Sequence, residues 1–472
     1  MTYRLSLLSL FILSLILSTM ACSKDSDSGK SFSDVSMWVT KADKSVLMAP
    51  SNEAVGDRIN SAPARYFINT EQTFQEMDGF GFALTGGSAT HFMGMSANRR
   101  TATLRELFSE DEGAVSMSYI RITIGASDLD DNPFSYSDLP PNQTDESLSG
   151  FSIDPDRTAL IPVLKEILAI NPDIKIMGSP WSPPAWMKTN RSTVGGELLE
   201  QFYDAYALYF VKYIQAYAAE GITIDAITIQ NEPLHAGNNP SLFMPADQQN
   251  NFIKRSLGPI FQQEGITTKV IIYDHNADRT DYPIEILNDS VTRNYVDGSA
   301  FHLYGGSIND LMKVKEAHPD KNIYFTEQWY SSEGDFGQDL LYHSSVIITG
   351  GALNWCKAII EWNLSSNDTF TPHTDGGCTM CKGAITINGD NVARNAGYYA
   401  IGHYSKFVKP GAIRVNTNQV NGMSSVAFKN PDNSTAFVLT NSTNEDRLVN
   451  IESDGIAFSA TVPARSVASF VW

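Results

Sequence analysis

The chain has 472 residues, of which 42% are hydrophobic and 18% charged, an ordinary composition for a globular protein. This length accommodates one large domain and a smaller one. The net charge of −19 argues against nucleic acid or an anionic membrane surface as a partner, because both repel an acidic protein. An acidic surface suits a neutral substrate, although it also serves solubility alone.

The N-terminus has the layout of a secretory signal. Arg4 supplies a positive charge, an apolar run follows over residues 7–17, and small residues then lead to Cys22. A cysteine directly after a small residue resembles a bacterial lipobox, in which the cysteine is acylated after cleavage. Thr19 stands where lipoboxes usually have Leu. No other stretch approaches the roughly 20 apolar residues that a membrane span needs.

We therefore predict a lipoprotein signal peptide over residues 1–21, lipidation of Cys22 and a flexible polar tether over residues 22–33. A signal peptide without lipidation is the alternative. The predicted location is the cell surface or the periplasm, with the protein held to the outer membrane through its lipid anchor alone.

The middle of the chain alternates short apolar strands with helical stretches, which is typical of a parallel sheet. Helical patterns include residues 162–170 and 198–221. Eight strands are predicted, at residues 77–86, 118–126, 174–181, 226–233, 270–276, 299–306, 322–329 and 358–364. Eight strands in this arrangement predict a closed (β/α)8 TIM barrel, which we place at residues 73–402.

Beyond Tyr404 the pattern changes. Short alternating strands follow one another, separated by Asn, Asp, Gly and Pro, with no helical pattern between them. This predicts a small antiparallel β-sandwich side domain over residues 403–472. Residues 34–72 contain further predicted strands, which we expect to contribute to the same side domain.

Three cysteines lie in the body of the chain. Cys378 and Cys381 form a CxxC motif in a Gly-rich loop, and a zinc site would need two further ligands, of which only His373 is close in the sequence. In an exported protein, a local disulfide is the favoured state of such a pair. Cys356, beside Trp355, has the pattern of a buried free thiol.

Two glutamates at predicted strand ends are the strongest functional signal. Glu232 stands between Asn231 and Pro233 at the end of barrel strand four, and Glu327 ends strand seven. The C-terminal strand ends form the active-site face of a barrel, so both carboxylates can converge over its mouth. Such a pair performs glycoside hydrolysis. We predict Glu232 as the acid/base, with its pKa raised by the neighbouring carboxylate, and Glu327 as the nucleophile of a retaining double displacement.

Polar residues at other strand ends are predicted to bind the substrate. Asn231 is placed to bond the 2-hydroxyl of a sugar, and Asp128 to accept bonds from further hydroxyls. Arg121 lies inside strand two and should point into the barrel top, where it would pair with an acid. The structural alternatives are a helix cap for Asp128 and a purely structural ion pair for Arg121.

Aromatic residues recur at the same end of the barrel. Trp181, Trp329 and Trp362 offer flat apolar faces against which a sugar ring can lie. His302 and Tyr304, after strand six, are placed to orient the carboxylates. The alternatives are core packing for the tryptophans and a satisfied core histidine for His302.

Segments that carry these residues resemble glycoside hydrolase family 30, the family of lysosomal glucosylceramidase. They appear in the family's order and cover nearly the whole mature chain: FQEMDGFGFALTGG, SYIRITIGASDL, IMGSPWSPPAWMKTN, ITIQNEP, SAFHLYGG, YFTEQW, EWNL and IGHYSKFVKPGAIRV. The resemblance implies a (β/α)8 barrel with a side β-domain built from both chain ends. It also implies a retaining mechanism with Glu232 as acid/base and Glu327 as nucleophile. The sugar-binding residues that it implies are Asp128, Trp181, Asn231, Tyr304 and Trp362.

The chain departs from glucosylceramidase around the predicted site. Leu303 replaces an aromatic residue, bulky Gln328, Trp329 and Tyr330 follow the nucleophile where small residues are usual, and the loop GGCTMCKG differs. These departures resemble the bacterial and fungal branch of the family that cleaves β-1,6-glucan. We hypothesise that Trp329 and its neighbours shape a cleft for a hooked β-1,6-linked chain.

The leading prediction is an endo-β-1,6-glucanase that acts on a β-glucan polysaccharide or oligosaccharide as a monomer. The alternatives are an exo-acting β-glucosidase, glucosylceramidase or β-xylosidase of the same family, and a non-catalytic surface lipoprotein that binds glycans. No cofactor is expected, and no metal, because no His/carboxylate spacing in the sequence suits a metal site.

Overall fold

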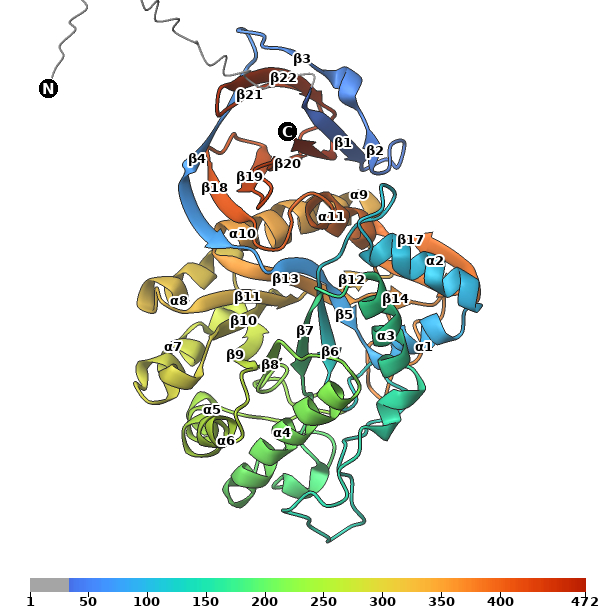
Figure 1. Cartoon of the computed structure of the whole chain (residues 1–472), viewed down its shortest axis with the longest axis vertical. Helices are drawn as coiled ribbons and strands as arrows, with labels where there is room; N and C mark the ends of the chain where they lie inside the picture. The colour runs from blue at the N-terminus through green and yellow to red at the C-terminus, as the bar shows by residue number, and fades with distance from the viewer. Residues whose placement is uncertain (1–33) are drawn as a thin grey trace, which may run out of the picture.

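The computed structural model of the chain describes residues 34–472 (Figure 1). The predicted signal peptide, the tether and the lipidation site at Cys22 lie outside these residues and stay predictions. A β-domain lies above a barrel in the view of Figure 1. Within the described part, no helix is both long enough and apolar enough to cross a membrane.

The barrel has eight parallel strands and is closed, as predicted. Each strand coincides with one of the predicted strands. In chain order they are β5 (Gly79–Leu84), β6 (Tyr119–Thr123), β7 (Lys175–Ser179), β8 (Ala226–Thr228), β9 (Lys269–Asn276), β10 (Gly298–His302), β11 (Asn322–Glu327) and β13 (Cys356–Asn363). Around the barrel the order is β10-β11-β13-β5-β6-β7-β8-β9, so neighbours in sequence are neighbours in space.

Helices follow the strands and cover the outside of the barrel (Figure 1). They are α1 (Gly86–Met93), α2 (Ala97–Phe108), α3 (Leu160–Ile170), α4 (Tyr203–Ala219), α5 (Ala246–Phe252), α6 (Gly258–Gln263), α7 (Asp281–Asn288), α8 (Leu311–Ala317), α9 (Phe336–Tyr342), α10 (Gly350–Leu353) and α11 (Ala396–Ser405). The two predicted helical patterns correspond to α3 and α4. Helix α4 buries Tyr206, Tyr209 and Tyr213, whose spacing places them on one face toward the core.

The side domain is a ten-stranded sheet built from both ends of the chain, as expected. Its order is β2-β1-β23-β20-β19-β18-β4-β21-β22-β3. The strands are β1 (Ser36–Lys41), β2 (Ala49–Pro50), β3 (Val55–Asp57), β4 (Ala64–Glu76), β18 (Ile413–Thr417), β19 (Met423–Lys429), β20 (Thr435–Asn441), β21 (Arg447–Ser453), β22 (Ile456–Val462) and β23 (Ser466–Val471). One pair, β4 with β21, is parallel, whereas the sequence predicted antiparallel pairing throughout. Only strands joined by a hairpin must be antiparallel. Because β4 and β21 come from opposite ends of the chain, no hairpin joins them and they can pair in parallel.

Two elements join the side domain to the barrel. Strand β4 runs on to Glu76 and α11 ends at Ser405, so both continue past the expected barrel limits of 73 and 402. His403 of α11 bonds the hydroxyls of Ser469 in β23 and Thr40 in β1. Phe428 and Val438 of the side domain also belong to the hydrophobic cluster that surrounds the barrel strands, so the two domains share part of a core.

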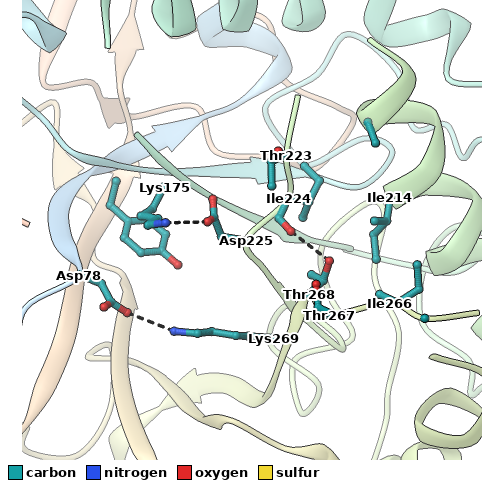
Figure 2. Close-up of a pocket in the computed structure, with 13 residues that line it drawn as sticks. Asp78, Lys175, Ile214, Thr223, Ile224, Asp225, Ile266, Thr267, Thr268 and Lys269 are labelled. Carbon is teal, nitrogen blue, oxygen red and sulfur yellow. Dashed lines mark hydrogen bonds and ion pairs between the residues drawn. The ribbon is translucent and has the colours of Figure 1, made fainter. Parts of the chain in front are cut away.

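The N-terminal end of the barrel carries a cavity of about 430 Å³ (Figure 2). Its polar side chains are paired with one another: Lys175 lies 3.0 Å from Asp225, and Lys269 lies 3.7 Å from Asp78. Asp225 also accepts the backbone N–H of Ile176 at 2.9 Å. In barrel enzymes this end contributes to stability, while function resides at the other end.

We expect Asp225→Ala to lower the free energy of unfolding by about 2 kcal/mol, because it leaves a buried strand N–H without its acceptor. Chemical denaturation measures this loss. The hydrolase activity expected from the sequence should stay unchanged, and the exposed Asp173→Ala serves as the control for stability. Loss of activity in a folded Asp225→Ala protein would contradict the assignment of this end to stability.

Candidate active site

The interior of the barrel is layered. A lower layer is apolar and consists of Tyr119, Met177, Ala226, Ile271, Ala300, Tyr324, Ala358 and Ile360. Strand residues two positions further along point to the same interior, one level nearer the C-terminal ends. That next level is polar and buried, and it contains Arg121, Ser179, Thr228, His302 and Thr326. The barrel thus places charged groups directly beneath its mouth.

Arg121 occupies the centre of the polar layer, and all three nitrogens of its guanidinium donate hydrogen bonds. It donates to Glu327 Oε2 at 2.6 Å, Asn231 Oδ1 at 2.7 Å, Asp274 Oδ2 at 2.8 Å and Ser179 Oγ at 3.1 Å. Burial opposes its charge, but the carboxylates of Asp274 and Glu327 raise the pKa of Arg121 above its ordinary value. The predicted inward orientation and acidic partner of Arg121 are both present.

Asp274, which was not among the predicted site residues, is the second centre of this network. Besides the bond from Arg121, it accepts hydrogen bonds from Thr228 at 2.7 Å, Thr326 at 2.6 Å and His302 Nε2 at 3.1 Å. Burial would raise the pKa of Asp274, but the Arg121 charge and these bonds outweigh it and hold the pKa far below the usual range. Asp274 is therefore a permanent negative charge within the barrel.

A backbone irregularity aims Asp274 inward. Tyr273 and Asp274 have φ angles of 72° and 69°, and the register between β9 and β10 shifts at this point. Such left-handed residues are costly outside glycine and concentrate at functional sites. Glu232 also has a positive φ of 45°, and its N–H donates to the carbonyl of Asp274. The site thus contains three strained residues.

His302 links Asp274 to Glu232. Its Nε2 faces Asp274, and its Nδ1 lies 3.0 Å from Glu232 Oε1. Burial lowers the pKa of His302, but the charge of Glu327 and the bonds to Asp274 and Glu232 outweigh that effect and raise it to about 9. At neutral pH the ring is therefore doubly protonated and donates from both nitrogens.

The two predicted catalytic glutamates meet at the mouth of the barrel. One oxygen of Glu232 and one of Glu327 lie within 4.8 Å of each other. Glu327 accepts from Arg121 and, at 3.0 Å, from the hydroxyl of Tyr304. This spacing suits the carboxyl separation of about 5–5.5 Å in retaining glycosidases and is shorter than the roughly 6.5–9.5 Å of inverting ones.

The protonation of the pair is set by its surroundings. Burial raises the pKa of Glu327, and the charge of Glu232 adds to the rise, against the opposing effects of His302 and Arg121. Burial also disfavours the charge of Glu232, but the hydrogen bond and charge of His302 outweigh it and lower the pKa of Glu232. The expected rise in the pKa of Glu232 from its neighbouring carboxylate is therefore wrong for the ligand-free site, where Glu327 holds a proton more readily than Glu232.

A cleft of about 340 Å³ lies above the glutamates and contains the predicted sugar-binding residues. Besides Glu232 and Glu327 it is lined by Asp128, Trp181, Asn231, Tyr304, Trp329 and Trp362. Arg121 and His302 lie directly beneath. Every predicted site residue within the described part of the chain is thus in the cleft or in the polar layer under it. Asp274, buried beneath the cleft, and Asn238, which lines it, were not among the predicted site residues. Residues 377–381, which include the CxxC pair, also line the cleft.

Several polar groups in the cleft wall are suited to sugar hydroxyls. The indole N–H of Trp181 is buried and has no partner among residues 34–472. The Trp181 and Trp362 rings lie 5.4 Å apart, and the Arg121 guanidinium lies 5.0 Å from the Trp181 ring. Burial, with a contribution from the Glu327 charge, raises the pKa of Asp128 to about 7. A ligand that offers hydroxyl donors and acceptors beside apolar ring faces would satisfy these groups.

Glu232, His302 and Glu327 are close enough together to be considered as metal ligands. A ligating histidine must offer a lone pair, whereas both ring nitrogens of His302 carry protons that point at carboxylates. The donor set therefore does not suit a metal ion. The cysteines are as expected: Cys378 and Cys381 form a disulfide, and Cys356 is a buried free thiol.

Comparison with known proteins agrees with this geometry. The profile of the glycosyl hydrolase family 30 TIM-barrel domain matches residues 77–408, and that of the family's beta sandwich domain matches residues 411–470. An endo-1,6-beta-D-glucanase of Neurospora crassa is 35% identical over 418 residues, covering 84% of this chain and 85% of that protein. The lysosomal acid glucosylceramidase of Mus musculus is 27% identical over 432 residues, covering 86% and 82%. The solved structure of the endo-beta1,6-glucanase BT3312 has a TM-score of 0.86 and 36% identity, covering 94% of this chain and 99% of that one.

The raised pKa of His302 predicts a pH-dependent stability. Its pKa is about 9 in the folded protein against 6.5 as the ordinary value, so its contribution is complete below 6.5 and is lost as the pH rises through 9. A shift of this size corresponds to about 3 kcal/mol. Relative to wild type, His302→Asn should therefore lose most of the stability difference between about pH 6 and about pH 10, measured by chemical denaturation. The control is His235→Asn, and parallel curves for wild type and His302→Asn would refute the prediction.

Proposed function

The chain belongs to glycoside hydrolase family 30, whose members are retaining enzymes, and we propose that it cleaves β-1,6-linked glucan internally. The observation that carries the proposal is the identity to endo-1,6-beta-glucanases, at 35% and 36% over most of the chain. The partly exposed Trp329 in the cleft supports it, because it offers a ring face beyond the glutamates on which a further glucosyl unit can lie.

The proposed reaction has two steps. In the first, a Glu327 oxygen bonds to C1 of the sugar, the bond from C1 to the glycosidic oxygen breaks, and that oxygen takes the proton of Glu232. In the second, ionised Glu232 takes a proton from water, and the water oxygen bonds to C1 and releases Glu327. Two inversions at C1 retain its configuration.

These roles require a proton on Glu232 when substrate is bound, whereas in the ligand-free site the pKa of Glu232 is lowered and that of Glu327 is raised. The substrate itself favours the reversal. The glycosidic oxygen accepts a hydrogen bond only from a protonated Glu232. The positive charge that develops at C1 stabilises an ionised Glu327, which Arg121 and Tyr304 already hold as an acceptor.

The surrounding residues have corresponding roles. Asn231 accepts from Arg121 through its side-chain oxygen, so its amide N–H groups face away from the guanidinium and are available to a sugar hydroxyl. We assign them to the 2-hydroxyl, where a bond strengthens in the transition state. Trp181 and Asp128 bind other hydroxyls of the same unit, and Trp362 packs against its ring.

Product analysis tests the function. Purified mature protein acting on β-1,6-glucan should release a ladder of short β-1,6-linked oligosaccharides, and Trp329→Ala should reduce this cleavage. Glucosylceramide and an aryl β-glucoside serve as comparison substrates. Release of single glucose units from the comparison substrates alone would move the assignment to an exo-acting enzyme, which the 27% identity to a glucosylceramidase makes the second candidate. Binding of glucan without turnover would indicate a glycan-binding protein.

The assignment of the glutamates predicts different defects in two variants. Glu232→Gln should lower turnover of glucan by about 10²–10⁴-fold, because proton transfer to a poor leaving group is lost. It should affect a dinitrophenyl β-glucoside much less in the first step, because that leaving group needs no acid. Glu327→Ala should abolish turnover of both substrates, and added azide should restore it with inverted product, since azide attacks from the vacated face. Equal defects on the two substrates in Glu232→Gln would refute the acid role.

A further inference from the structure

We infer that the disulfide-closed turn Gly377–Cys381 is a specificity-determining wall of the cleft, which holds Asp128 against glycone hydroxyls remote from C1. The inference rests on the proposed function, because it presumes a glycoside in the cleft. It adds a role for Cys378, Cys381 and Gly377, which the catalytic mechanism does not use.

The turn forms a wall of the site. Gly377, Cys378, Thr379, Met380 and Cys381 line the same cleft as the two glutamates. The buried Cys381 packs with an apolar cluster that includes Leu129, Trp181 and Trp362, and Trp329 and Cys378 contact this cluster from its edge. The disulfide and the tryptophans of the cleft therefore belong to one packed unit.

The turn is anchored on the side of the nucleophile. Cys381 belongs to the short strand β15 (Cys381–Lys382), which pairs with β12 (Tyr330–Ser331). The N–H of Ser332 also donates to the carbonyl of Met380 at 2.8 Å. Because β12 begins three residues after Glu327, the position of the turn is tied to the strand that carries the nucleophile.

The other side of the turn holds Asp128. The N–H of Cys378 donates to Asp128 Oδ2 at 3.3 Å, and the N–H of Thr374 donates to the carbonyl of Asp128 at 2.9 Å. A Cβ at Gly377 would lie 2.4 Å from that carbonyl, so only glycine permits the approach. The disulfide fixes the residue whose N–H orients the Asp128 carboxylate.

The topology shows which part of the sugar Asp128 meets. In the closed barrel β6, which precedes Asp128, is four strands from β10 in either direction. The residues that follow or end β10, Tyr304 and His302, contact Glu327 and Glu232. The reacting C1 must lie between the glutamates, so the side of the ring that faces Asp128 is the one remote from C1, with the hydroxyls on C3 and C4. A carboxylate held by one N–H can accept bonds from such hydroxyls.

The experiment uses dinitrophenyl β-glucosides that lack a single hydroxyl, on C2, C3 or C4. For wild type, removal of the hydroxyl that Asp128 binds should lower kcat/KM by roughly 10- to 100-fold, the value of a charge-assisted hydrogen bond. In the double variant Cys378→Ser, Cys381→Ser this loss should shrink to a few-fold, while KM for the complete glucoside rises. The loss on removal of the C2 hydroxyl, which faces Asn231, should be the same in both proteins.

A second variant distinguishes an effect of the turn on Asp128 from a general loss of stability after the disulfide is removed. Gly377→Ala keeps the disulfide but displaces the Asp128 carbonyl, and it should give the same loss of discrimination. Gly376→Ala is the neighbouring control, because its Cβ meets nothing within 4 Å. Gly376 has a φ of 82°, so this substitution strains the backbone of the turn, and retained discrimination in it would show that such strain is not the cause of the loss. If the serine variant does not fold, the two glycine variants decide the question.

The outcomes distinguish the inference from the function on which it rests. Unchanged discrimination at C3 and C4 in folded variants, with loss of the disulfide verified by mass, would overturn the role of the turn. An equal fall for all three deoxy substrates would also overturn it, since that result indicates a general distortion. A wild type that turns over neither glucan nor any aryl glucoside would instead overturn the proposed function.

Discussion

The site depends on one buried cation, Arg121, at the axis of the barrel. A guanidinium removed from water is tolerated only when its donors are paired with good geometry, and the barrel supplies two carboxylates, an amide and a hydroxyl. With the protonated His302, two cations face the carboxylates of Asp274, Glu232 and Glu327. Two positive and three negative charges leave one excess negative charge, so one added proton would make the cluster neutral overall. The charge balance therefore permits the proton that acid catalysis needs and fixes the carboxylates at the same time.

The carboxylates of the site are held in place by residues with unfavourable backbone conformations. Positive φ angles at Glu232, Tyr273 and Asp274 persist because the surrounding bonds leave these residues no alternative. The apolar layer below, with Tyr119 and Tyr324 among its members, provides the rigid floor on which the polar layer rests. Within one barrel, the apolar layer thus serves stability, and the polar layer nearer the C-terminal strand ends serves the chemistry.

Much of this architecture follows from local sequence patterns. The eight strands and both glutamates were predictable because strand period, strand-end chemistry and the NEP segment are short-range signals. Asp274 stands at a predicted strand end, but its central role depends on a bulge that a regular period of two does not reveal. The disulfide was predictable from the CxxC spacing. The hydrogen bond from the N–H of Cys378 to Asp128, 250 residues away in the sequence, depends on how two loops meet in space, and no local sequence pattern predicts it.

The pairing of the first strand with the last has a consequence for synthesis. Strand β1 hydrogen-bonds β23 over Ser36–Lys41 and Ser466–Val471, and β23 also pairs with β20. On the ribosome, β1 therefore emerges long before its partner exists, and the sheet is completed only after β23 has emerged. Until then an unpaired edge is exposed, which invites association with other chains. A nascent chain of this topology should depend on chaperones that shield β1 until β23 has emerged.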